Sequence, residues 1–216
     1  MLEKMSDFFE ARLAGYDEHM LTNIESANEF YAFTAEQLPT AESSRVLDLG
    51  CGTGLELEKF YVLNPYARVT GIDLSKGMLS ALKKKFADKE LTIIHGSYFD
   101  IPFGVGVFDA AVSVESLHHF TKAEKIPLYQ KLCCALRDGG CFILTDYFAQ
   151  SDEEEKLHRQ NFENEKAEQG IVDDGIYHYD TPLTVAHEID ALLTAGFSSV
   201  EILKCWGATQ TLKASK

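Results

Sequence analysis

Short runs of apolar, often β-branched residues alternate along the chain with longer segments whose apolar residues recur at helical spacing. The runs predict five strands, at 45–49, 68–72, 91–95, 108–114 and 141–145. Helical patterns lie between them, near 53–63, 75–86 and 121–136. Strands that alternate with helices at this spacing indicate βαβ units, in which helices cover both faces of a parallel sheet. The pattern therefore predicts a doubly wound α/β fold.

Capping and turn residues predict where several elements begin and end. Ser75 is expected to cap the helix after the second strand, and Thr121 with Glu124 forms the Thr-x-x-Glu pattern of a capping box. The glycine pair at 139–140 is expected to precede the fifth strand, and Gly196 to end the last helix.

Two segments outside the alternation suggest how the single domain, 1–216, is organised. Residues 1–37 carry two amphipathic helical patterns and are expected to form a helical cap on a core at 38–149. Residues 150–180 carry an acidic helix and an aromatic loop, which predict a lid insertion. Residues 181–216 hold a helix and two β-like stretches, which should pair antiparallel because their connection is short.

Charge narrows the classes of partner. The chain has 20 Lys and Arg against 34 Asp and Glu, a formal charge of −14. Nucleic-acid binding requires a row of basic residues, and the only basic cluster, 83–85, lies inside a predicted helix. The sequence therefore predicts no nucleic-acid partner and no anionic membrane partner. Residues 151–174 hold nine acids and three bases, so they carry −6 of the net charge.

Cysteine usage and the absence of targeting signals favour a cytoplasmic protein. The five cysteines form no Cys-x-x-Cys pair, and their odd number argues against a disulfide framework. No apolar run approaches the roughly 18 residues of a membrane span, and the first twenty residues do not resemble a signal peptide. No Cys/His spacing matches a zinc site, so no metal is expected.

A glycine-rich turn after the first strand is the strongest chemical signal. Residues 48–54 read Asp-x-Gly-x-Gly-x-Gly, at the point where a strand should give way to a helix. Leu55 stands where the dinucleotide fingerprint requires its third glycine, and no Gly-Lys-Ser/Thr follows to cradle a phosphate. Asp73 ends the second strand about twenty residues later, where a carboxylate can accept both ribose hydroxyls. The two motifs predict a nucleoside ligand without a phosphate.

With these motifs the sequence resembles the class I S-adenosylmethionine-dependent methyltransferases of the small-molecule type, over about residues 45–215. Segments 96–103, 108–120 and 136–144 are similar to the family's segments around its third, fourth and fifth strands. Residues 195–201 resemble its C-terminal turn from helix to strand. The resemblance implies a Rossmann-like seven-stranded sheet, mostly parallel with an antiparallel last strand.

The resemblance also implies S-adenosyl-L-methionine as cofactor and S-adenosyl-L-homocysteine as product. In the family's arrangement, the backbone of Gly50, Cys51 and Gly52 would contact the methionine half of the cofactor. Asp48 would lie near the cofactor's ammonium group, and Asp73 would hold its ribose.

The remaining matched positions would surround the adenine and the reacting end. Leu74 and Met78 would pack on the adenine ring, and Ser97 and Tyr98 would meet its edge. Family members often carry Asp at the position of Ser97, and a serine is the weaker acceptor for the adenine amino group. Val114, at the end of the fourth strand, would lie near the methionine moiety.

Catalytic candidates follow from the ends of strands, where such sheets bind ligands. Methyl transfer is an in-line displacement, and positioning supplies much of the rate, so a base is needed only when the acceptor must lose a proton. His118 and His119 follow the fourth strand, and Asp146 ends the fifth. These three are the candidates for a base or for ligand contact.

Aromatic and histidine residues of the cap, the lid and the C-terminal strands are the candidates for binding the acceptor. Tyr16 and His19 lie on the predicted cap, and Tyr147 follows Asp146. Tyr177 lies in the lid loop, and Trp206 lies in the C-terminal β region. An aromatic wall can hold a cation or a flat apolar molecule.

These features predict methyl transfer to a neutral or cationic small molecule by a monomer or homodimer. One alternative is an enzyme that modifies the cofactor itself, as in carboxy-S-adenosylmethionine synthesis. It would require a cation for the added carboxylate, and no Arg lies in the motif segments. The other is a non-catalytic regulator that binds S-adenosylmethionine.

Overall fold

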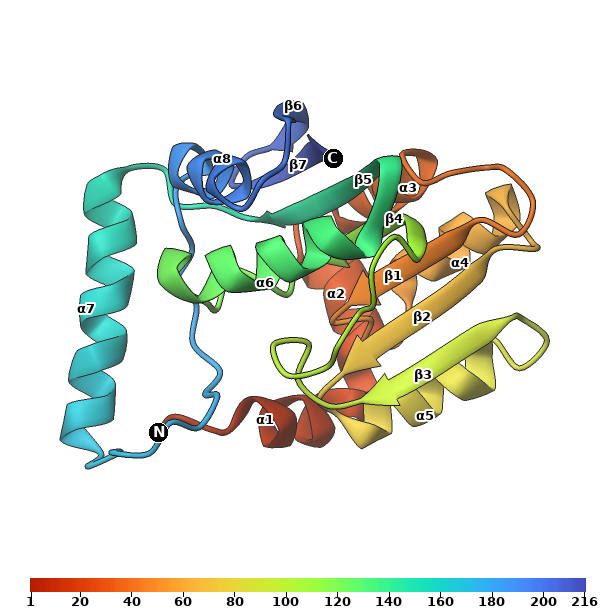
Figure 1. Ribbon diagram of the computed structural model, residues 1–216. Coiled ribbons are helices and arrows are strands. Elements are labelled where there is room, and N and C mark those ends of the chain that lie inside the picture. The colour runs from red at the N-terminus through yellow and green to blue at the C-terminus, as the bar shows by residue number, and fades with distance from the viewer.

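The computed structural model describes residues 1–216 as one seven-stranded mixed sheet with helices on both faces (Figure 1). The strands are β1 Arg45–Leu49, β2 Arg68–Asp73, β3 Leu91–His95, β4 Phe108–Val114, β5 Leu136–Tyr147, β6 Ser199–Trp206 and β7 Thr209–Ser215. The helices are α1 Met5–Arg12, α2 Tyr16–Asn23, α3 Ala27–Glu36, α4 Leu55–Leu63, α5 Lys76–Lys85, α6 Lys122–Ala135, α7 Asp152–Glu168 and α8 Val185–Thr194. The strand order is β3-β2-β1-β4-β5-β7-β6, with β7 antiparallel to both neighbours. The fold expected from the sequence is confirmed.

Alternating side chains along each strand divide the core into two layers. Leu47 and Leu49 of β1 pack on the side of α6 and α8, whereas Val46 packs on the side of α3, α4 and α5. This alternation follows from the twofold periodicity of a strand. Because both faces are covered, β1 and β4 are buried almost throughout, which explains their unbroken apolar runs.

The predicted caps are present, but the start of β5 differs from the expectation. The Ser75 hydroxyl caps α5, Thr121 with Glu124 forms the capping box of α6, and Gly196 with φ +106° follows the end of α8. β5 begins at Leu136, before the glycine pair at 139–140, because Leu136 already pairs with β4 and the glycines form an irregularity within the strand.

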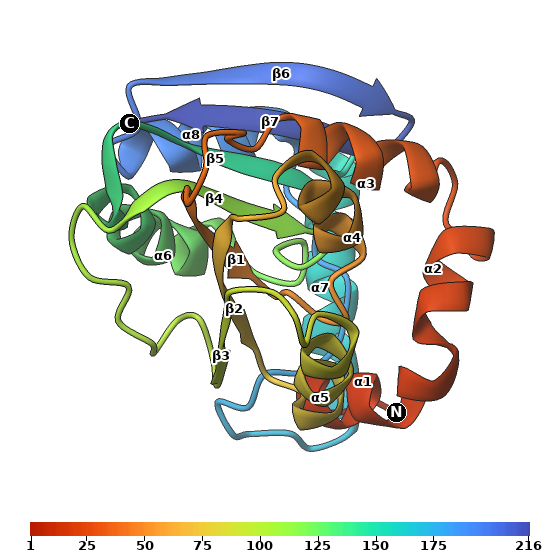
Figure 2. The ribbon, with the colours of Figure 1, turned by 90° about the vertical axis from the view of Figure 1, so that its right-hand side faces the viewer.

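The N-terminal cap consists of three α-helices and a 3₁₀ turn, Leu13–Gly15, instead of the two helices expected. α1 and α2 lie across the carboxyl ends of the parallel strands (Figure 2). Glu10 of α1 accepts hydrogen bonds from the Ser75 hydroxyl (2.8 Å) and the Gly77 amide (2.9 Å). Asp17 of α2 accepts from the Thr53 hydroxyl and from Lys85 Nζ (2.9 Å). Two carboxylates thus hold the cap to the glycine turn and to α5.

α7 stands apart from the sheet as an upright helix at the left of Figure 1. None of its residues is buried. Glu155 attaches it to the loop before α8, because its carboxylate accepts from the Thr184 amide (2.7 Å) and pairs with His187 Nδ1 (2.8 Å). None of the helices combines the length and the apolarity that a membrane span requires.

α6 and α8 are joined by a buried ion pair. Lys125 Nζ lies 2.5 Å from Glu188 Oε2, and the two side chains are 1% and 0% exposed. The Tyr129 hydroxyl donates to the other oxygen of Glu188. A second pair between the same helices, Lys122 with Asp190, lies on the surface.

We expect Lys125→Met to lower the free energy of unfolding by about 3–5 kcal/mol, because it leaves the Glu188 carboxylate buried without a cation. Urea unfolding followed by circular dichroism measures the change. Lys122→Met is the matched control and should have almost no effect, because that pair is exposed. An equal loss in both variants would contradict the assigned role of burial.

Candidate functional site

Two adjoining cavities lie where the carboxyl ends of β1, β2 and β4 meet the cap. The smaller has a volume of about 40 Å³ and the larger about 840 Å³. Four residues line both cavities: Phe9, Tyr16, Glu115 and His119. A ligand in one cavity would therefore lie against a ligand in the other.

The glycine turn forms the floor of the smaller cavity. Gly50 has φ +76°, and a Cβ there would lie 2.0 Å from Ser116 Oγ, so no other residue fits. Gly52 faces open space on the cavity side. Asp73 accepts from the Gly52 amide (2.9 Å) and the Ser75 amide (2.8 Å), which fixes its carboxylate at the edge of this turn. Carboxylate oxygens have further lone pairs for a ligand's hydroxyls.

A buried pair of carboxyl groups lies beneath the glycine turn. Asp48, the penultimate residue of β1, is 1% exposed, and Glu56 in the first turn of α4 is 5% exposed. One oxygen of each, Asp48 Oδ2 and Glu56 Oε1, has no hydrogen-bond partner. Burial, and then the neighbouring Glu56, raise the pKa of Asp48 well above its usual value, and burial raises the pKa of Glu56. The two carboxyl groups can therefore bind a cation between them or share one proton.

Of the ten positions matched to cofactor contacts, five line the smaller cavity: Gly50, Gly52, Asp73, Met78 and Val114. The other five do not line it: Asp48, Cys51, Leu74, Ser97 and Tyr98.

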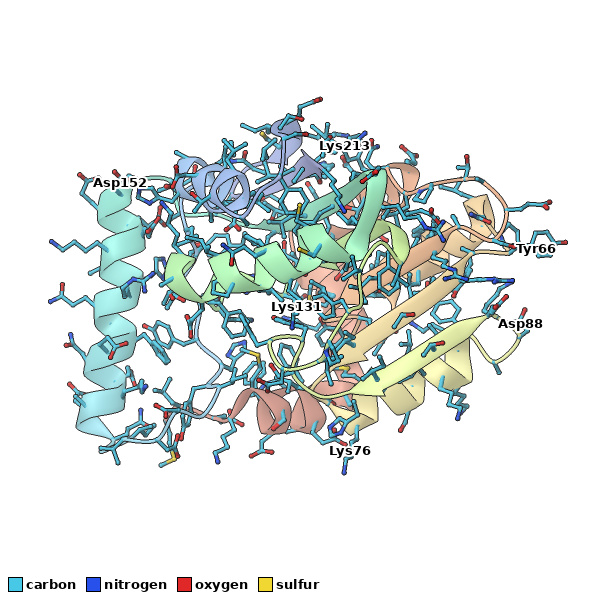
Figure 3. The ribbon with its side chains drawn as sticks, viewed as in Figure 1. Tyr66, Lys76, Asp88, Lys131, Asp152 and Lys213 are labelled. Atoms are coloured by element: carbon cyan, nitrogen blue, oxygen red, sulfur yellow. The ribbon has the colours of Figure 1, made fainter.

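Contacts with the surrounding chain hold several of these five positions in place. The Cys51 side chain packs against Gly71, where a Cβ would lie 2.7 Å from its sulfur, and burial raises the pKa of its thiol. Ser97 and Tyr98 belong to the loop after β3. Lys131, near the centre of Figure 3, holds this loop, because Nζ donates to the carbonyls of Tyr98 (2.6 Å), Phe99 (2.8 Å) and Ile101 (2.8 Å).

The three residues predicted as catalytic gather at the polar end of the larger cavity. His118 Nδ1 lies 2.5 Å from Asp146 Oδ1, and Asp146 also accepts from the Leu117 amide (2.9 Å) and the Tyr147 amide (3.0 Å). Asp180 joins them from the loop before α8, with Oδ1 3.4 Å from His118 Nε2. Burial disfavours the His118 imidazolium, but the two carboxylates outweigh it and hold the pKa of His118 well above its usual value.

His119 differs from its neighbour in charge. Its Nδ1 lies 3.1 Å from the Tyr179 carbonyl oxygen and 3.3 Å from Asp180 Oδ1. A carbonyl can only accept, so Nδ1 carries the proton and Nε2 keeps a lone pair. Burial and the adjacent His118 lower the pKa of His119. His119, the neutral one of the two histidines, thus lines both cavities.

Glu115 was missed by the sequence reasoning although it lines both cavities. It is the first residue after β4 and has φ +49°, a left-handed conformation that is uncommon outside glycine. Its Oε1 accepts from the Thr209 hydroxyl (3.2 Å), and burial together with Asp146 raises its pKa to about 7. Its place at the end of a central strand was the available signal.

The cap supplies most of the larger cavity's apolar wall. The apolar side chains from this part of the chain are Phe8, Phe9, Ala11, Ala14, Met20 and Ile24. The polar part of the lining includes Glu115, Tyr147, His178 and Asp180. His178 stacks on Phe8 with ring centroids 3.5 Å apart, and burial and then His119 lower the pKa of His178 to about 4.

Three of the five predicted acceptor-binding residues line this cavity: Tyr16, His19 and Tyr147. Tyr177 does not, because its hydroxyl donates to Asp173 in the lid loop and its backbone pairs with Lys4. Trp206 does not either, because its ring packs edge-on against Phe33 and its Nε1 donates to Glu29 (3.2 Å).

The structure also places two charged features relative to the cavities. α7, which carries most of the acidic segment, contributes no residue to either cavity. Arg12 lines the larger cavity, although it lies outside the segments that carry the motifs. The Arg12 guanidinium pairs with Glu3 (3.0 Å) and lies 3.6 Å from the Phe8 ring centroid, so its charge is already engaged.

Sequence comparisons with known proteins find similarity to methyltransferases. Residues 46–140 match a family model described as a methyltransferase domain. An uncharacterised methyltransferase from Synechocystis sp. is 31% identical over 124 residues, which are 57% of this chain and 57% of that protein. The chain spans about half the length of the first curated relatives that it matches.

Solved structures share the fold. An O-methyltransferase candidate from Nostoc punctiforme superposes with a TM-score of 0.73 at 22% identity, covering 99% of this chain and 62% of that one. The DhpI protein, solved as a complex with SAM and HEP, superposes with a TM-score of 0.70 at 19% identity, covering 96% of this chain and 94% of that one. These superpositions show that the chain shares the Rossmann-like fold of these two proteins.

We expect Glu56→Gln to stabilise the ligand-free protein by about 1–3 kcal/mol near neutral pH, because it removes one of two buried, unpaired carboxyl groups. The folded pKa values of Asp48 and Glu56 lie above their usual 3.8 and 4.5. The folded chain therefore binds more protons than the unfolded chain above those values. Stability contributed by the protonated pair is present at low pH and is lost as pH rises through the raised pKa values.

Thermal unfolding between about pH 5 and pH 8 tests this linkage. The variant should lose less stability than the natural chain as pH rises. Glu42→Gln, at an exposed position with no charge partner, is the matched control and should follow the natural chain. Parallel pH profiles for the natural chain and Glu56→Gln would rule out the carboxyl pair as the cause.

Proposed function

We propose that the chain, whose residues 46–140 match a methyltransferase domain, is a class I S-adenosylmethionine-dependent methyltransferase that methylates a small neutral or cationic molecule held in the larger cavity. The observation that carries the proposal is the junction of the two cavities at Phe9, Tyr16, Glu115 and His119. A donor on the glycine turn and an acceptor under the cap would meet there.

The residues around the smaller cavity fit the cofactor. S-adenosylmethionine supplies a methyl group on a positively charged sulfur, together with an ammonium group. The unpaired oxygens of Asp48 and Glu56 suit such a cationic ligand, and no phosphate-binding cluster is required. Asp73 would accept from the ribose hydroxyls. Because the closed cavity holds only about 40 Å³, Phe9 and Tyr16 of the cap would move aside as the cofactor enters.

The cap would contribute to catalysis by orienting the acceptor and excluding water. Holding donor and acceptor in line supplies up to about 7–11 kcal/mol of the barrier reduction. The wall formed by Phe8, Met20 and Ile24 would pack on an apolar part of the acceptor. Its nucleophilic atom would then lie at the polar end, beside His119 and Glu115.

The two histidines would handle the acceptor's proton in different ways. In its neutral form His119 has a lone pair on Nε2 that can take up a proton. His118 is held in its charged form by Asp146 and Asp180, so it would orient the acceptor and would not act as a base. The acidic residues Glu115 and Asp180 favour an acceptor that is neutral or positively charged.

A panel of small acceptors with O, N and S nucleophiles tests the proposal directly. We expect S-adenosylhomocysteine to form with at least one apolar acceptor that carries a single polar nucleophile. Cofactor binding with no product from any acceptor would favour a non-catalytic regulator. A carboxylated cofactor that co-purifies, detected by mass spectrometry, would favour cofactor modification.

We expect Asp73→Asn to weaken S-adenosylhomocysteine binding by about 10- to 100-fold, because hydrogen bonds to a charged acceptor are worth about 1.5–3 kcal/mol. Isothermal calorimetry on the folded variant measures the loss. Asp88→Asn, in the turn between α5 and β3 (Figure 3), is the control, because Asp88 lines neither cavity, and it should bind as the natural chain does. Unchanged affinity in Asp73→Asn would contradict the cofactor site.

We expect His119→Asn to lower kcat by about 10²–10⁴-fold with little change in cofactor affinity, because it removes the neutral imidazole between the cavities. Steady-state kinetics with the best acceptor of the panel, together with calorimetry, separate the two effects. His158→Asn on α7 serves as the control. A loss confined to KM would place His119 in acceptor binding only.

A further inference from the structure

Three potential metal ligands converge at the polar end of the larger cavity. Asp180 Oδ1 lies 3.4 Å from His118 Nε2 and 3.3 Å from His119 Nδ1, and the three atoms lie within 4.8 Å of one another. We propose that His118, His119 and Asp180 form a binding site for a divalent transition-metal ion of the zinc class.

The spacing of the three atoms suits such an ion. Zinc lies about 2.0–2.1 Å from imidazole nitrogen and about 2.0–2.2 Å from carboxylate oxygen. Tetrahedral geometry then separates neighbouring ligand atoms by roughly 3.3–3.5 Å. Both measured distances to Asp180 fall in this range. One ion placed between the three side chains would thus need only small adjustments of the rings.

The surroundings of His118 match those of a metal-bound histidine. Such a ring donates its second N–H to a carboxylate or carbonyl, which fixes its orientation and raises its basicity. Asp146 Oδ1 lies 2.5 Å from His118 Nδ1, and two backbone amides hold Asp146 in place. The ring is therefore oriented with Nε2 toward Asp180.

A simple ion pair accounts for only part of the arrangement. A charged His118 between Asp146 and Asp180 explains one imidazole nitrogen beside the carboxylate oxygen. His119 Nδ1 donates to the Tyr179 carbonyl (3.1 Å), and the same nitrogen also lies 3.3 Å from that Asp180 oxygen. An ion would replace the protons of His118 Nε2 and His119 Nδ1, and its bonds to the three groups would take the place of the hydrogen bond to Tyr179.

The ligand set indicates both the kind of ion and the kind of site. Two imidazoles with one carboxylate favour zinc or other transition metals over magnesium and calcium, which prefer oxygen ligands. Three protein ligands leave coordination positions open, as in catalytic sites. All three side chains line the larger cavity, so an open position would face the acceptor.

The role of the ion rests on the proposed function. A Lewis acid beside the acceptor would lower the pKa of its O–H or S–H group, and the released proton would pass to water. The lone pair left on the acceptor would form the new bond to the methyl carbon, while the carbon–sulfur bond breaks and its electron pair stays on sulfur. The preferred acceptor is then an alcohol, phenol or thiol, and His119 acts as a ligand when the ion is bound.

Cobalt titration of the purified, chelator-treated full chain tests the site without any turnover assay. We expect one equivalent of Co²⁺ to produce visible ligand-field absorption and to be displaced by Zn²⁺. Asp180→Asn and His119→Ala should each weaken binding by at least tenfold. Asp180 is half-exposed on a loop, so Asp180→Asn should fold normally. It therefore tests the site even if His118→Ala, at a buried position, fails to fold. Asp146→Asn should weaken binding by about 10- to 100-fold.

His187→Gln provides the matched control. His187 also lies near two carboxylates, Glu155 (2.8 Å) and Asp152 (3.9 Å), but it has no second imidazole. It should leave Co²⁺ binding unchanged. Absence of saturable binding to the natural chain would overturn the proposal, as would binding lost in His187→Gln and retained in Asp180→Asn.

The outcomes also separate this site from the methyl transfer itself. If the natural chain binds S-adenosylhomocysteine and methylates an acceptor at full rate with a chelator present, the role of the ion in methyl transfer is overturned and the proposed function stands. If the chelator abolishes methylation and stoichiometric Zn²⁺ restores it, with cofactor affinity unchanged throughout, both are supported. Metal binding without any cofactor binding would support the site and defeat the function.

Discussion

The reversal of strand order between β1 and β4 is the constraint on which the rest of the structure depends. The chain leaves β1 toward α4 on one face of the sheet and leaves β4 toward α6 on the other. Two neighbouring parallel strands that diverge in this way leave a crevice beyond their carboxyl ends. The glycine turn lies on one side of the crevice, and Glu115 with the histidine pair lies on the other. The positions of the cap, of the two cavities and of Glu115 all follow from the position of this crevice.

Local patterns in the sequence predicted the parts of this arrangement that depend on neighbouring residues. The strand positions, the capping box at Thr121 and the glycine turn each have a short-range cause, and all were found. The cap was predicted as a region, but its division into three helices was not, because α1 and α2 are short and acquire their orientation through Glu10 and Asp17. The start of β5 at Leu136 depends on pairing with β4, which no local pattern records.

Residues brought together from distant segments explain what the sequence did not predict. His118, His119 and Asp146 were picked out because each follows a strand, but Asp180 lies in a loop about which periodicity says nothing. Cys/His spacing predicted no metal site, because ligands at residues 118, 119 and 180 are too far apart in the sequence to form a spacing motif. Trp206 was chosen for its aromatic ring alone, and the sheet edge places that ring against α3 instead. The pairing of Asp48 with Glu56 likewise requires strand and helix to pack together.

The position of the cap has a kinetic consequence. Phe9 and Tyr16 stand over the cofactor side and the acceptor side at once. A single moving element would therefore govern four events: entry of the donor, entry of the acceptor, release of the methylated product and release of the spent nucleoside. Donor and acceptor could not exchange independently while the cap is closed. Binding and release would then follow a fixed order, and the opening of α1 and α2 would limit the turnover rate. Because Glu10 and Asp17 hold these helices to the glycine turn and to α5, the breaking of their contacts would set the rate of opening.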